Sequence, residues 1–93
     1  MGRLERRLLA IGDELERIHE EERLISDELS YHRSLADDAA RDAAVFGDPI
    51  ERENASVTAS DVRRFERQLA KVVDRRQKLE ARRARLLDKL ESR

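Results

Sequence analysis

The stretch AAVFGDPIEREN, residues 43–54, decides how this chain folds, because it interrupts a sequence that otherwise has the pattern of continuous helix. It holds the only proline, Pro49, directly after Gly47 and Asp48. Gly47 suits the left-handed position that ends a helix. Asp48 can cap the next helix, and Pro49 fits its first turn. With Glu51 at the third helical position, DPIE is close to a capping box. The stretch therefore predicts a reversal between two helices.

Two start signals compete for the second helix. The first is the Asp48 cap, and the second is the run TASD, in which Thr58 would cap and Asp61 would hold the third position. Between them the run NASVTAS, residues 54–60, is a weak helix former. We expect a first arm over about 3–46, a tip over about 47–57, and a second arm over about 58–92 or, by the earlier signal, from 49.

Apolar residues recur at alternating spacings of three and four in both arms, which is the heptad pattern of a coiled coil. The first seam holds Leu4, Leu8, Ile11, Leu15, Ile18, Glu22, Ile25, Leu29, His32, Ala36, Ala39, Ala43 and Phe46. The second holds Val62, Phe65, Leu69, Val72, Arg76, Leu79, Arg83, Leu86 and Leu90. The sequence predicts a single all-α domain over 1–93, a two-helix antiparallel coiled-coil hairpin. Dimerisation to a four-helix bundle stays open.

Composition narrows the class of protein. Of the 93 residues, 44% are charged and 3% are aromatic, which is typical of long helices with a narrow apolar seam. There is no cysteine, so disulfides and thiolate metal sites are excluded. No apolar run approaches the roughly 20 residues that span a bilayer. We expect a cytoplasmic protein with no membrane partner, and the 17 arginines against 3 lysines suggest a bacterial source.

Charge predicts how the arms pair. Residues 1–46 hold 7 basic and 12 acidic side chains, net −5, whereas residues 62–93 hold 12 basic and 5 acidic, net +7. Aligning opposite charges places Glu14 by Lys89, Glu21 by Arg82, Glu28 by Arg75, Arg33 by Glu66 and His19 by Glu80. This alignment layers Leu15 on Leu86 and Ala36 on Phe65, and it centres the turn between Ile50 and Glu51. A register one heptad away satisfies fewer charge pairs and stays open.

Polar residues within the seams call for an explanation. Glu22 lies within a layer of either Arg76 or Arg83, so we expect an ion cluster that sets the register at some cost in stability. His32 is expected to be a packed, hydrogen-bonded seam residue. His19 is too far from it along the helix for a metal pair, which needs a spacing of three or four.

The acidic turn resembles the tips of bacterial RNA polymerase secondary-channel regulators, the Gre cleavage factors and the DksA/TraR proteins. Gre tips read like G-D-L-K-E-N-A, and GDPIERENA keeps Gly47, Asp48, Glu53, Asn54 and Ala55 with two extra residues. DksA-like tips read like D-P-x-D-R, which DPIER matches. The resemblance covers the hairpin only. The docking domain of Gre factors and the cysteine zinc module of DksA are missing from this chain.

Two functions follow as expectations. The resemblance implies a non-catalytic transcription regulator that binds RNA polymerase through its tip, with Asp48, Glu51, Arg52, Glu53 and Asn54 as the contact residues. The alternative is a structural or adaptor coiled coil that binds itself or another helical protein. Its docking face would hold three apolar residues outside the seam, Leu9, Leu24 and Tyr31.

Neither expectation involves catalysis. No catalytic triad, phosphate loop or metal motif is present in the sequence, so we expect no enzyme activity, no cofactor and no metal site. The arginine-rich second arm lacks stacking aromatics and faces complementary acids, so direct binding of nucleic acid is not expected.

Overall fold

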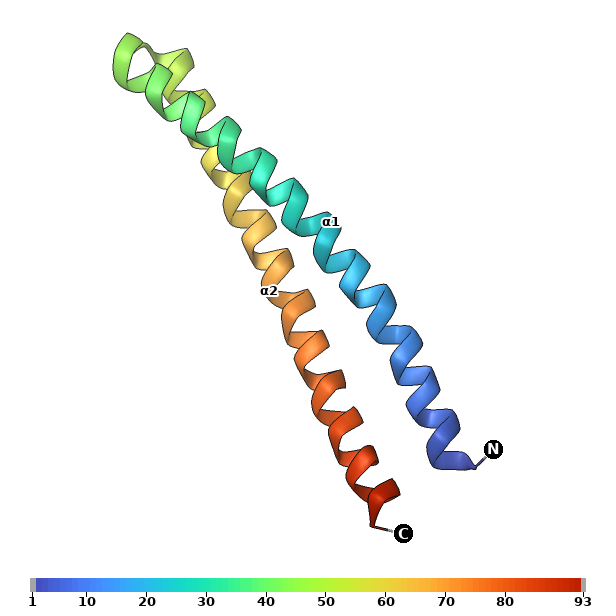
Figure 1. Ribbon diagram of the computed structural model, residues 1–93. Helices are drawn as coiled ribbons and strands as arrows, with labels where there is room; N and C mark the ends of the chain where they lie inside the picture. The colour runs from blue at the N-terminus through green and yellow to red at the C-terminus, as the bar shows by residue number, and fades with distance from the viewer. Residues whose placement is uncertain (1, 93) are drawn as a thin grey trace. The chain divides into compact units, whose positions relative to one another are not determined.

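The structure is a computed structural model that describes residues 2–92. Two helices make up this part of the chain, α1 (Arg3–Phe46) and α2 (Pro49–Glu91), with only Gly47 and Asp48 between them. Over the described residues there is no strand. The chain reverses at the turn between α1 and α2 (Figure 1), so the predicted all-α antiparallel helical hairpin is confirmed. Neither helix, as far as it is described, is long and apolar enough to cross a membrane.

The turn is built as the sequence predicts. Gly47 has a φ of 66°, and its N–H donates to the carbonyl of Ala43 at 2.9 Å, which closes α1 in the left-handed conformation that glycine adopts at little cost. Asp48 caps α2, since its Oδ1 accepts a hydrogen bond from the N–H of Glu51 at 2.9 Å. Pro49 then holds the first helical position, where its missing N–H is not needed.

Of the two possible starts for the second helix, the structure has the earlier one, so the expected tip to residue 57 is replaced by a turn of two residues. Thr58 is not a cap. Its hydroxyl donates to the carbonyls of Asn54 and Ala55, at 2.9 and 3.1 Å, as in a helix interior. Once Asp48 has nucleated the helix, each further residue adds a backbone hydrogen bond, which outweighs the weak propensity of residues 54–60.

The helices divide into two compact units. The first unit comprises Met1–Arg23 and Lys71–Arg93. Its core is a cluster of the buried side chains Ile11, Leu15 and Leu86, against which Leu4, Leu8 and Leu79 pack. Ile18 and Val72 are also buried in this unit. Burying a side chain of this size contributes about 1.5–3 kcal/mol, so this cluster dominates the stability of the unit.

The second unit, Leu24–Ala70, contains the turn. Leu29 is the one side chain that is buried within residues 24–70, all of which the structure describes. The rest of the seam is half-buried, and the rings of His32 and Phe65 stack with centroids 4.5 Å apart. The small residues Ala36, Ala39 and Ala43 give this unit a thinner apolar core than the first.

The helices do not pair in the register that surface charge favoured. Arg75 lies 3.2 Å from Glu21, one heptad before the acid that the charge alignment assigned to it. Phe65 stacks on His32, where that alignment placed Ala36, and the chain reverses at Gly47 rather than after Ile50.

Four expected charge pairs fall within one unit, and none of them forms among the described residues: Glu14 with Lys89, Glu21 with Arg82, His19 with Glu80, and Arg33 with Glu66. The alternative register, one heptad away, is the one observed. A two-residue turn brings the ends of both helices to the same level, and exposed pairs worth about 0.3–0.5 kcal/mol each cannot displace it.

Two predicted seam residues are exposed. Phe46 is 66% exposed, because α2 begins only three residues later and no helix faces the last turn of α1. Arg83 is also exposed and does not join Glu22.

Candidate functional site at the turn

The acids of the turn are partly used by the fold. Asp48 is exposed, but its Oδ1 holds the N–H of Glu51, and its carbonyl accepts from the N–H of Arg52 at 3.1 Å. Glu51 is half-buried at the third helical position. Glu53 is exposed and takes no part in the cap. Asp48 therefore has a structural role that any functional role must share.

These acids do not converge on one point. Glu51 and Glu53 are two residues apart on α2, so their side chains leave the helix about 200° apart. Over residues 2–92 no group of three acidic, histidine or cysteine side chains could hold a metal ion. Arg52 and Asn54 are exposed, and the carbonyl of Asn54 accepts the Thr58 hydroxyl. The predicted contact residues share the first turns of α2, but they do not form an acidic cluster.

An apolar group beside the turn is the feature that sequence reasoning missed. Val45 is 76% exposed, Phe46 66% and Ile50 72%. We name these three residues the turn-end patch. They flank Gly47 and Asp48 on both helices, where no facing helix covers them. The turn signals could have located them, because apolar residues next to a two-residue turn have no opposite helix to pack on.

The expected docking face is divided. Leu24 and Tyr31 are exposed, lie one heptad apart on α1 and belong to the second unit. Leu9 is exposed too, but it belongs to the first unit and to a different heptad position. Leu35 and Val57 are further exposed apolar residues of the second unit. The three predicted residues therefore do not form a single face.

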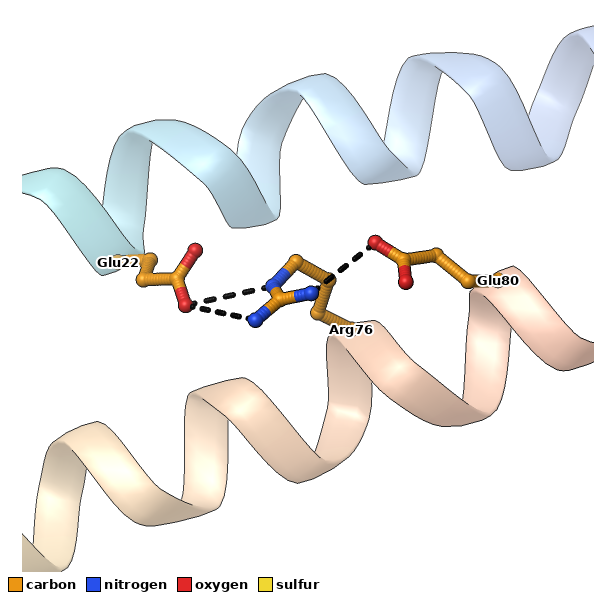
Figure 2. A network of polar contacts seen from close by, with 3 residues as sticks. All are labelled: Glu22, Arg76 and Glu80. Carbon is orange, nitrogen blue, oxygen red and sulfur yellow. Dashed lines mark hydrogen bonds and ion pairs between the residues drawn. The ribbon is translucent and has the colours of Figure 1, made fainter.

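A network of polar contacts lies between the helices in the first unit (Figure 2). Arg76 from α2 donates to the Glu22 carboxylate of α1 through Nε at 3.3 Å and Nη2 at 3.2 Å. Its Nη1 donates to Glu80, one turn further along α2, at 3.2 Å. The hydrogen bonds to Glu80 and then to Glu22 raise the pKa of the Arg76 guanidinium above its usual value. The predicted pairing of Glu22 with a seam arginine is found with Arg76.

His32 is packed, but it lacks the hydrogen bond that was expected. Its ring stacks on Phe65, and Tyr31 meets its edge with centroids 5.4 Å apart. Nε2 lies 3.6 Å from the Glu28 carboxylate, which is too far for a hydrogen bond. Nδ1 is buried with no hydrogen-bond partner in the described part of the chain. His32 acts as an aromatic spacer in the seam.

Other ion pairs lie on the outer surface within single helices. Glu20 accepts two hydrogen bonds from Arg23, which lower the pKa of that carboxyl. Asp74 lies 2.9 Å from the Lys78 ammonium and raises the pKa of that lysine. Pairs of this kind support helices weakly and build no site.

Comparison with protein-family models, with curated proteins and with solved structures finds no match to this chain.

Proposed function

We propose that this chain is a non-catalytic protein-interaction hairpin that binds a protein partner through its turn-end patch. The observation that carries the proposal is the exposure of Val45, Phe46 and Ile50 at one end of a helical hairpin. Large aromatic and aliphatic side chains are costly to leave in water, and such groups rimmed by polar residues are typical of interaction sites. Here the rim is acidic, with Asp48 and Glu53 beside the patch.

The patch suits the centre of a small interface. Phe46 offers a rigid ring, which loses little conformational entropy on binding. The acidic rim favours a partner whose apolar pocket is bordered by lysine or arginine, since opposite charges speed association and select the orientation. The rigid helices on both sides of the turn hold the patch in a fixed arrangement before binding, and this reduces the entropy lost on association.

Photo-crosslinking in the cells that make this protein tests the proposal. A photoreactive phenylalanine analogue replaces Phe46 in one variant and Leu9 in a matched control, which is also an exposed apolar residue. We expect a discrete crosslinked product from position 46, lost when Ile50→Ser is added, and none from position 9. Equal yields from both positions, or no product from position 46, contradict the proposal.

A second candidate is the regulator of transcription that acts on RNA polymerase. It is supported by the exposure of Asp48, Glu53 and Asn54, which carry the resemblance, at the turn. The test is binding to core RNA polymerase and its effect on transcription. The variant Asp48→Asn/Glu51→Gln/Glu53→Gln removes the charges but keeps a capping side chain at residue 48.

If the acids act on the polymerase, this variant still binds but loses the effect on transcription. If only the patch matters, Phe46→Ser/Ile50→Ser loses binding and the charge variant behaves as wild type. Absence of wild-type binding at micromolar polymerase excludes this second candidate and leaves the turn-end patch for another protein.

A further inference from the structure

The second unit has an exposed flank that the turn-end patch does not include. Leu24, Tyr31 and Leu35 on α1 and Val57 on α2 are exposed there. In the heptads defined by the seams, each of the four is at position c or g. Apolar residues on one flank of a hairpin are not explained by packing within it. We name these four residues the lateral flank.

The two helices present these positions on the same side of the hairpin. In an antiparallel pair, g positions of one helix face g positions of the other. The structure shows this pairing in the first unit, where Glu21 and Arg75 are both at g and lie 3.2 Å apart. The same heptad phase continues through α1 and α2 in the second unit. Leu24, Tyr31 and Leu35 therefore share a side with Val57.

Charge selects the occupant of this flank. Residues 24–46 hold five acidic and two basic side chains, net −3, whereas residues 62–70 hold three basic and one acidic, net +2. On the flank itself, Glu28 lies beside Tyr31 on α1, and Arg64 and Arg67 lie on α2. An acidic, apolar surface on one helix and a basic one on its neighbour are complementary when a second copy is stacked with α1 over α2.

We propose that a second copy of this chain binds the lateral flank, with α1 of each copy lying over α2 of the other and both turns at the same end. This arrangement brings Glu28 toward Arg64 and Arg67 of the other copy and stacks Leu35 near Val57. The opposite orientation places α1 on α1, where acids meet acids, and like charges in contact oppose association. The dimer is a four-helix packing of residues 24–70, with two-fold symmetry.

The first experiment is sedimentation equilibrium over a range of micromolar concentrations. We expect wild type to approach twice the chain mass of 10.9 kDa. Tyr31→Glu weakens self-association at least tenfold, because it buries a charge among apolar groups. The matched control is Leu9→Glu, since Leu9 is 58% exposed and Tyr31 60%. It leaves association unchanged. Leu24→Ser gives a second flank variant without an added charge.

Two further variants test the orientation. Glu28→Arg weakens the dimer, and adding Arg64→Glu in the same chain restores it. The chain has no cysteine, so Glu53→Cys takes a single nitroxide label at the turn. Pulsed electron resonance then reports a short label-to-label distance if both turns lie at the same end.

A wild-type protein that stays monomeric at about 100 μM, where typical specific dimers are formed, overturns the proposal. So does a loss of association in Leu9→Glu as large as in Tyr31→Glu. A long label-to-label distance overturns the orientation. Crosslinking from Phe46 is read separately. A monomer that still crosslinks there retains the proposed function, and a dimer that does not crosslink retains only this inference.

Discussion

Gly47 and Asp48 alone separate two helices of 44 and 43 residues. Each solves one local problem. Gly47 adopts a φ of 66°, which a residue with a Cβ adopts only under strain, and Asp48 satisfies the N–H of Glu51. Because the turn has no further residues, these two side-chain choices also set the level at which α1 and α2 meet.

The cap gives the first prediction. Asp48→Ala lowers the free energy of unfolding by about 1 kcal/mol, because the N–H of Glu51 loses its acceptor. Asp48→Asn keeps most of that stability. Urea unfolding followed by circular dichroism measures both. Glu53→Ala, at an exposed position outside the cap, is the control and should change little. An equal loss in Glu53→Ala would show that the effect is not capping.

The two helix-related glycines should respond in opposite ways. Gly12 lies inside α1, and a Cβ added there meets nothing within 4 Å, so Gly12→Ala stabilises by about 0.5–1 kcal/mol. Gly47→Ala destabilises by about 1 kcal/mol or more, since its φ is positive. Thermal unfolding of the two variants measures the contrast. A gain in stability from Gly47→Ala would contradict the left-handed turn.

At the scale of the helices, the seam is apolar except where a polar contact gives it direction. Arg76 reaches across to Glu22 and along α2 to Glu80. Arg83 holds the same heptad position but is exposed. The pattern of apolar residues cannot tell these arginines apart, because the register decides which of them meets an acid.

Substitution of the two arginines separates their roles. Arg76→Leu lowers the midpoint of thermal unfolding, because it leaves Glu22 between the helices without its cation. Arg83→Leu leaves the midpoint near that of wild type. The double variant Glu22→Leu/Arg76→Leu should regain or exceed wild-type stability, since apolar packing replaces the pair. Equal effects of the two single arginine substitutions would contradict the observed cluster.

Amide exchange should differ along α2. Its buried residues are Val72 and Leu86, and its first turns carry only half-buried and exposed side chains. Local opening therefore costs less free energy over residues 52–60 than near Leu86. Hydrogen exchange followed by mass spectrometry should show exchange at least about tenfold faster over 52–60, which corresponds to 1.4 kcal/mol. Residues 52–60 exchanging as slowly as those near Leu86 would contradict this.

At the scale of the whole molecule, opposite net charges on the arms favour antiparallel pairing but do not select its register. Arm one is net −5 over residues 1–46, and residues 62–93 are net +7, so many alignments are attractive. Each exposed pair contributes less than about 1 kcal/mol. The turn and the buried side chains therefore determine which pairs form, and the register follows from them.

Double-mutant cycles test that register. Glu21→Ala with Arg75→Ala should give a coupling energy of about 0.2–1 kcal/mol, because their side chains lie 3.2 Å apart. The matched cycle of Glu21→Ala with Arg82→Ala should give none. Added salt should reduce the first coupling, as it does for exposed pairs. Coupling to Arg82 instead would restore the register that charge alone favoured.

The sequence by itself determined the helical class, the reversal, the cap at Asp48 and the positive φ of Gly47, because these depend on residues close together in the chain. It also indicated Glu22 as the partner of a seam arginine. It left the start of α2 open, since caps at Asp48 and Thr58 satisfy the same local rules. Only the tertiary structure decided the register, the choice of Arg76 over Arg83 and the exposure of Phe46. These depend on which residues of the two helices come to the same level, and a heptad repeat is equally satisfied by levels seven residues apart.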